Sequence, residues 1–155
     1  MGYFRSLRLQ YFPLKKVDTV FGKLLYMYIP NDSQKSYWEC EWKFPPTDTV
    51  ISISLPGDES GPYDESRAFY KDLISKYEKI LSLVRPQLNV VFQEWLNKDL
   101  PDNMFSDLKL SGFDLADSRA KPVCWDISFE TIGNKWLGIT VSFKDEVSEQ
   151  ATVDT

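Results

Sequence analysis

The feature that most constrains this fold is one long helical pattern at residues 64–97, which has strand-like patterns on both sides of it. Its apolar residues recur in steps of three and four, so they share one stripe of a helix. The opposite side is largely charged, which predicts a helix with one face in solvent and the other on an apolar layer. The first part of the stripe consists of Phe69, Leu73, Tyr77, Ile80 and Val84.

Pro86 interrupts this helical pattern. A proline inside a helix removes a hydrogen bond and crowds the preceding turn, whereas the first position of a helix tolerates it well. We therefore predict a helical pair at about 64–84 and 86–97, with a break near Arg85; a single kinked helix is the alternative. The stripe of the second helix consists of Leu88, Val91, Phe92, Trp95 and Leu96.

Strands are indicated wherever apolar and polar residues alternate, because successive side chains of a strand point to opposite faces of its sheet. The clearest alternation lies at residues 36–44. Four tryptophans fall on inward positions and are expected in the core, namely Trp38, Trp42, Trp95 and Trp125. Further strands are expected at 24–29, 49–55, 108–115, 123–132 and 136–143, with a bend at Gly112, a hairpin turn at Gly133-Asn134, and a short strand or extended arm at 3–12.

The order of strands, then helices, then strands, with short connections, favours the α+β class. We predict one antiparallel sheet of five to seven strands with the helical pair packed on one face. Both strand groups should join this sheet, because neither alone offers enough surface to cover two helices. Residues 1–145 would then form a single α+β domain, and residues 146–155 a flexible acidic tail.

The charge of the chain narrows the choice of partners. Its net charge is −5 and its pI is about 4.8, which argues against nucleic acid and against an anionic membrane surface as the main partner. A basic partner protein suits this charge. Since the N-terminus lacks a signal-peptide pattern and no apolar run approaches the length of a membrane span, we predict a cytoplasmic location.

The sequence carries no catalytic, cofactor-binding or metal-binding motif. It has no histidine, which removes the commonest general base, and its two cysteines, Cys40 and Cys124, have neither zinc spacing nor a disulfide framework. Carboxylate pairs remain on two strand faces, and each could flank a substrate as general acid and base. The simpler interpretation is that these acids solvate an exposed face. The pairs are Glu39 with Glu41 and Asp126 with Glu130.

One aromatic side chain falls outside the predicted core. Trp136 has the opposite parity from Leu137 and Phe143, so it is expected on the sheet face away from the helices. Together with Tyr37 and the neighbouring acids it would form a protein-binding surface. Strand-edge effects or a covering N-terminal arm would explain these aromatic residues equally well. The predicted interaction surface is Tyr37, Glu39, Glu41, Asp126, Glu130 and Trp136.

The chain also resembles a set of uncharacterised bacterial domains of small acidic proteins. The resemblance is carried by the Trp-rich strand from Trp38, the strand ending near Gly57, Gly61-Pro62, the helix with Tyr70, Tyr77 and Ile80, the second helix, and the Trp125-x-Ile-x-Phe and Trp136 strands. Such domains occur among proteins suspected of being immunity proteins in bacterial toxin systems. The resemblance implies an inhibitor that binds a basic toxin domain, and it carries over no active-site residue.

Three hypotheses follow from the sequence. The first is a non-enzymatic interaction protein that binds a basic partner, as an immunity-type inhibitor would. The second is a small enzyme or ligand-binding domain that uses paired carboxylates beside the helices. The third is a structural or assembly subunit.

Overall fold

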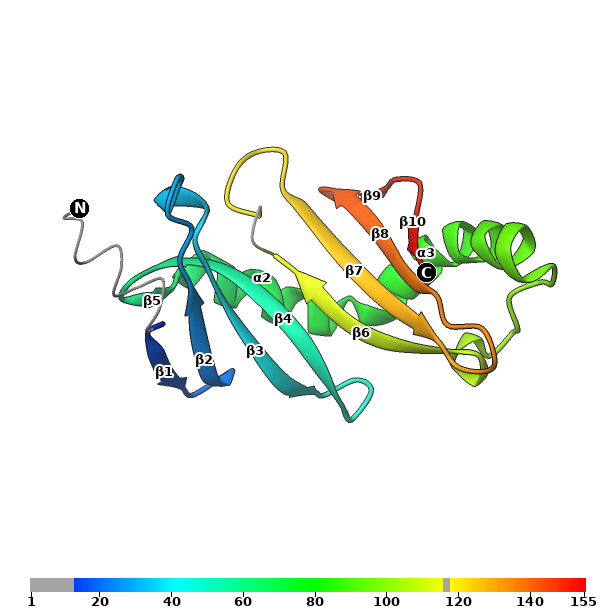
Figure 1. Cartoon of the computed structure of the whole chain (residues 1–155), viewed down its shortest axis with the longest axis horizontal. Coiled ribbons are helices and arrows are strands. Elements are labelled where there is room, and N and C mark those ends of the chain that lie inside the picture. The colour runs from blue at the N-terminus through cyan, green and yellow to red at the C-terminus, as the bar shows by residue number, and fades with distance from the viewer. Residues whose placement is uncertain (1–12, 116–117) are drawn as a thin grey trace.

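The computed structural model describes residues 13–115 and 118–155, which form one sheet with helices on one of its faces (Figure 1). The strand or arm expected at 3–12 lies outside the described residues. The elements are β1 (Lys15–Asp18), β2 (Gly22–Met27), a short 3₁₀ turn (Ser33–Lys35), β3 (Tyr37–Phe44), β4 (Thr49–Asp58), β5 (Gly61–Pro62), α2 (Asp64–Ser75), α3 (Tyr77–Val91), a wide π turn (Phe92–Leu96), a 3₁₀ turn (Met104–Ser106), β6 (Leu108–Asp114), β7 (Cys124–Thr131), β8 (Gly138–Lys144), β9 (Val147–Ser148) and β10 (Thr152–Asp154).

The sheet is larger than the sequence predicts, and it is mixed. Within the described residues it has ten strands, in the order β1-β2-β3-β4-β6-β7-β8-β10, with β5 beside β4 and β9 beside β8. The meander of β2, β3 and β4 and the hairpin of β7 and β8 are antiparallel, as predicted. The prediction of an antiparallel sheet of five to seven strands is wrong, because β4 and β6 pair in parallel and join the two halves at the centre.

The parallel join follows from the length of the helical connection. The two helices have 12 and 15 residues, which span about 40 Å at 1.5 Å per residue. Strand β4 has ten residues and spans about 33 Å. The helices therefore carry the chain back along the whole of β4, and β6 starts at the same end as β4 and runs in the same direction.

The helical pair breaks nine residues earlier than predicted. Helix α2 ends at Ser75, Lys76 leaves the helical conformation, and Pro86 lies inside α3. Pro86 is exposed, so the carbonyl of Ser82 that loses its partner can be hydrated instead. The buried stripe continues through the break without a gap, as Ser66, Tyr70, Leu73, Tyr77, Ile80, Val84, Leu88 and Val91. The apolar periodicity consequently gives no sign of where the two helices separate.

The core lies between the helices and one face of the sheet, and aromatic rings fill its centre. Phe44 is fully buried, and its ring centroid lies 5.1 Å from that of Tyr77 and 5.3 Å from that of Phe113. Further along the sheet, the rings of Trp125 and Phe143 stack at 4.2 Å. These rings come from β3, β6, β7, β8 and α3, so the two strand groups share one core.

Two of the four tryptophans predicted in the core are substantially exposed. Trp38 and Trp125 are buried, but Trp42 is 39% and Trp95 is 40% exposed. Trp42 lies over Gly22, where an added Cβ would come within 2.3 Å of its ring. Trp95 is on the π turn after α3, which shifts side chains away from the stripe that a regular helix would continue.

An ion pair fixes the β1–β2 hairpin to the helical layer. Asp18 is buried, its carboxylate pairs with Arg67 of α2, and it accepts hydrogen bonds from the backbone N–H groups of Val20 and Phe21. Burial by itself would raise the pKa of Asp18, but the hydrogen bonds and the Arg67 guanidinium outweigh it and hold the pKa below the ordinary value.

The last ten residues carry strands where the sequence predicts a flexible acidic tail. Strands β9 and β10 both pair with β8 and so form one edge of the sheet. The side chains of Ala151 and Val153 pack against the core. Two apolar residues at alternate positions are enough to dock this short edge strand, and they are too few to produce a recognisable pattern.

Candidate interaction face

The sheet has a second face, opposite the helices, which we call the bare face. It carries the alternate residues of every strand, and the pairing register places them in rows across the sheet. One row contains Leu25, Glu39, Ser54, Asp114, Asp126 and Ser142; the adjacent row contains Glu41, Ser52, Gly112, Ser128 and Thr140. The bare face is thus built from acids and small hydroxyl residues on the strands whose other side forms the core.

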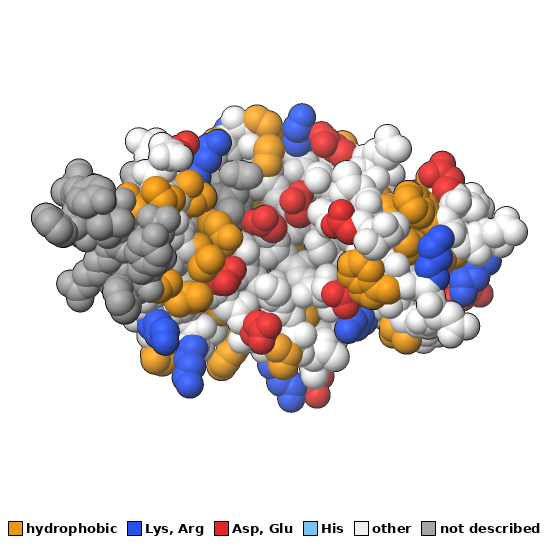
Figure 2. All heavy atoms as spheres, in the orientation of Figure 1, with side chains coloured by type: hydrophobic (Ala, Val, Ile, Leu, Met, Phe, Trp, Pro, Cys, Tyr) orange, Lys and Arg blue, Asp and Glu red, His pale blue; other side chains and the backbone are white. Residues whose placement is uncertain are grey.

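Acidic side chains gather over the central strands of this face (Figure 2). Among residues 13–115 and 118–155, Glu39, Glu41 and Asp126 form no ion pair within 4.0 Å. Glu130 pairs with Lys109 across the β6–β7 ladder at 3.0 Å. Within the part of the chain that the structure describes, the centre of the face is therefore negative and only partly balanced by cations.

An apolar strip borders the acidic centre on the side of β1 to β3 (Figure 2). It consists of Val17, Leu25, Met27 and Tyr37, of which Val17 is 78% exposed and the others are partly buried. Burial raises the pKa of the Tyr37 hydroxyl, and the nearby charges of Glu39 and Asp114 raise it further. Tyr37 is thus partly buried in the strip and also lies close to the acids of the negative centre.

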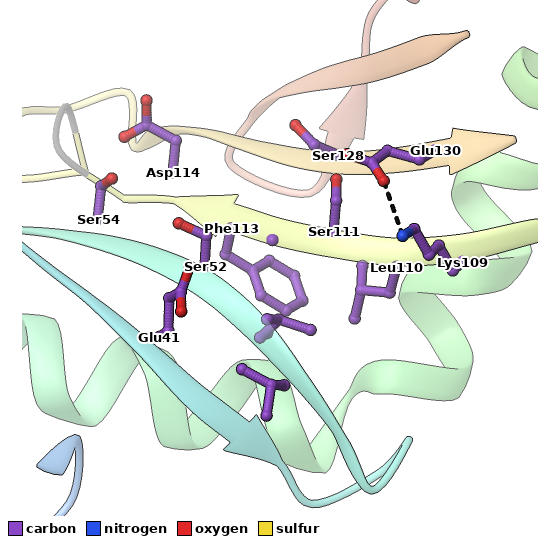
Figure 3. A pocket seen from close by; sticks show the side chains of 13 residues that line it. Glu41, Ser52, Ser54, Lys109, Leu110, Ser111, Phe113, Asp114, Ser128 and Glu130 are labelled. Carbon is purple, nitrogen blue, oxygen red and sulfur yellow. Dashed lines mark ion pairs between the residues drawn. The ribbon is translucent and has the colours of Figure 1, made fainter. Parts of the chain in front are cut away.

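A groove of about 500 Å³ opens in the middle of the bare face (Figure 3). Its floor lies where β4 pairs with β6, because Gly112 has no side chain and its backbone sits against Ser52; an added Cβ would come within 2.2 Å of the Ser52 carbonyl oxygen. A bulge between Leu110 and Gly112 inserts Ser111 beside it. Carboxylates of Glu41, Asp114 and Glu130 stand around the groove.

The structure brings five of the six predicted surface residues onto one face. Tyr37, Glu39 and Glu41 come from β3, and Asp126 and Glu130 from β7. The two predicted carboxylate pairs therefore lie on the same side of the sheet, separated by β4 and β6.

Trp136 lies at the opposite end of the sheet from Tyr37. It is 50% exposed in the connection between β7 and β8, close to the position that a Cβ on Gly138 would occupy. Strand β3 starts with Tyr37 at the end of the sheet where β7 also starts, whereas Trp136 follows the other end of β7. The two aromatic residues do not form one patch.

The sequence did not single out Asp114 or the serines of the groove. Asp114 lies directly opposite Asp126 in the β6–β7 ladder. The bulge at Ser111 shifts the alternation of β6 by one residue, so that Leu110, Gly112 and Phe113 are all buried. If residues 108–115 are assumed to alternate strictly, the residues before the bulge and those after it cannot both be assigned to the correct face. The bend predicted at Gly112 was the available signal.

Two kinds of feature are absent from the described residues. No group of three or more cysteine, aspartate or glutamate side chains is arranged to hold a metal ion. No helix in residues 13–115 and 118–155 combines the length and the apolar character that crossing a membrane requires.

Comparisons with known proteins do not place the chain in a family. No protein-family model, curated protein or solved structure matches it. Its function therefore has to be inferred from the faces of the molecule themselves.

Proposed function

We propose that this protein is a non-enzymatic interaction domain that binds a basic partner protein through the bare face. The observation that carries the proposal is the row across the sheet that begins with Leu25 and Glu39 and continues through Ser54 to Asp114 and Asp126, with an apolar strip at one end and carboxylates at the centre. An apolar area beside a charged one is typical of protein-binding surfaces.

Glu39, Glu41 and Asp126 form no ion pair with the described residues, which supports a role in binding. Asp114 and Asp126 face one another across the ladder, and like charges in that position weaken strand pairing. Basic groups of a partner would meet complementary potential here. Such complementarity speeds association and selects among partners more than it deepens affinity, while the apolar strip supplies surface that can be buried.

An immunity-type inhibitor is one specific role that fits this proposal. It follows from the resemblance of residues 38–96 to small acidic bacterial proteins of that kind, and it would make the partner a basic toxin domain. The cytoplasmic location stays a prediction that belongs to the same proposal.

A capture experiment with three versions of the full chain tests the proposal. The first is the unaltered protein. The second is the face variant, Glu39→Gln, Glu41→Gln and Asp126→Asn. The third is a matched control, Glu78→Gln, Glu94→Gln and Asp102→Asn, which makes the same change in net charge at exposed positions of the helical layer and the loop after it. Each version is immobilised and exposed to an extract of the native host.

The expected result is a basic protein that the unaltered chain and the control retain, that salt releases, and that the face variant fails to retain. Two outcomes would contradict the proposal. One is that no protein is retained at any salt concentration. The other is that the face variant retains the same partner as well as the control does.

A further inference from the structure

The groove in the bare face indicates which feature of a partner this surface recognises. It lies over β3, β4, β6 and β7, and the hollow exists because the row across its floor is built from small residues, Ser52, Gly112 and Ser128. The glycine is required here, since any side chain would meet the Ser52 carbonyl. The hollow is thus a fixed property of the β4–β6 join.

The lining of the groove consists mainly of hydrogen-bond acceptors. Carboxylates of Glu41 and Asp114 stand on one side, with Ser54 beside them, and that of Glu130 stands on the other. The hydroxyls of Ser52, Ser111 and Ser128 lie between the two sides (Figure 3). Among the described residues that line the groove, Lys109 is the single cation, and it is held at 3.0 Å by Glu130. This lining suits a cationic group with several N–H donors.

We propose that the groove seats the guanidinium group of an arginine carried on an extended segment of the partner protein. The inference rests on the proposed function and specifies its anchor. A guanidinium is planar, presents five donors in a fixed arrangement and is less strongly hydrated than an ammonium group, so carboxylates and hydroxyls at several angles can satisfy it at once.

The surroundings of the groove favour a protein segment over a free small cation. The apolar strip of Leu25, Met27 and Tyr37 lies on the same face, on β2 and β3. A segment that places an arginine in the groove can cover this strip with its neighbouring side chains, whereas a small cation leaves it in water. A peptide chain can therefore contact both the charged groove and the apolar strip, whereas a small cation can contact only the groove.

The test titrates the ¹⁵N-labelled protein with three peptides and follows its backbone amide signals by NMR. The peptides are acetyl-Gly-Arg-Gly-amide, its lysine analogue and its citrulline analogue, in which the guanidinium is replaced by a neutral group of the same shape. We expect shifts centred on the amides of Ser52, Gly112 and Ser128, with arginine binding more tightly than lysine and citrulline not binding.

Two single variants of β3 provide the control. Glu41 lines the groove, whereas Glu39 has the same charge on the same strand face, lies one row away from Glu41 and does not line the groove. Glu41→Gln should weaken arginine-peptide binding about tenfold, as expected for a hydrogen bond between charged groups. Glu39→Gln should change it by no more than about twofold, since solvent and salt screen its charge.

The proposal is overturned if the arginine peptide produces no shifts, if citrulline matches arginine, or if the shifts spread over acids of the helical layer. It is also overturned if the captured partner binds Glu41→Gln as tightly as the unaltered protein. That last result leaves the proposed function standing as long as the triple face variant still loses the partner, so the two failures can be told apart.

Discussion

The two faces of this sheet are made from the same strands and differ in almost every other respect. On β3, Trp38, Cys40 and Phe44 point to the helices and are buried, while Glu39 and Glu41 point the other way. The covered face holds the fold through burial of apolar surface. The bare face contributes little burial, so its residues can be selected for binding. Alternate residues of one strand therefore serve stability and binding. Substitutions on the covered face should change the free energy of unfolding, and substitutions on the bare face should change binding.

The largest expected contrast is in the reactivity of the two cysteines. Cys40 is buried on the covered face, where burial, followed by the charges of Asp18 and Glu39, raises its pKa to about 12. Cys124 is partly exposed and pairs in register with Lys144 on the bare face. Since the thiolate is the reactive form, a thiol reagent at pH 8 should label Cys124 at least a thousandfold faster than Cys40, as measured by mass spectrometry over time. Equal rates would contradict the assignment of these faces.

The next contrast compares stability on the two faces of β3. Phe44→Ala removes a fully buried ring that contacts Tyr70, Tyr77 and Phe113, and should lower the free energy of unfolding by about 4 kcal/mol. Glu41→Ala on the other face should change it by less than about 0.5 kcal/mol. Urea unfolding followed by tryptophan fluorescence measures both. A cost for Glu41→Ala comparable with that of Phe44→Ala would show that the bare face also holds the fold.

A smaller effect is expected from the buried ion pair of Asp18 with Arg67, between the hairpin and the helices. Asp18→Asn keeps an oxygen for the N–H groups of Val20 and Phe21 and removes only the charge that faces Arg67. Loss of this charge should lower the free energy of unfolding by about 2 kcal/mol at pH 7. The effect is small for a buried ion pair because Arg67 is partly exposed.

The sign of the pH dependence of this stabilisation follows from the pKa of Asp18. The folded pKa of Asp18 lies below 3.8, so its contribution is present above the unfolded pKa and is lost as the pH falls through the folded pKa. The difference in unfolding free energy between the unaltered protein and Asp18→Asn should therefore shrink below about pH 4. A difference that stays constant down to pH 2 would contradict the lowered pKa.

The smallest expected effect on stability belongs to the triple face variant. Replacing Glu39, Glu41 and Asp126 by their amides should leave the free energy of unfolding within about 0.5 kcal/mol of the original, with any change towards higher stability, because repulsion on the face decreases. The matched control, Glu78→Gln, Glu94→Gln and Asp102→Asn, shows how much of that change follows from net charge alone. A large loss confined to the face variant would mean that these acids are structural.

The sequence predicted the parts of the molecule that depend on local patterns. Alternation identified the strands around Trp38, Trp125 and Phe143, and the apolar stripe from Phe69 to Leu96 identified the helical layer. These patterns are strong because each element has one buried face. The face opposite the helices was predicted for the same reason, since the acids of β3 and β7 alternate with buried residues.

The parts that were missed depend on relations between distant segments. The parallel pairing of β4 with β6 is set by how far the helices carry the chain, and an antiparallel pattern and a parallel one look alike in a short strand. The break at Lys76 leaves the apolar stripe intact, so Pro86 was the only visible signal and it was misleading. Asp114 was overlooked because the bulge at Ser111 reverses the parity of its strand.

Carboxyl footprinting of the complex tests the central claim most directly. The protein, alone and with its captured partner, is treated with a carbodiimide and glycine ethyl ester, and labelling of each acid is read by mass spectrometry. We predict that the partner protects Glu39, Glu41 and Asp126 and leaves Glu78, Glu94 and Asp102 labelled as in the free protein. Protection of the second group, with the first unchanged, would place the partner on the helical side and contradict the account.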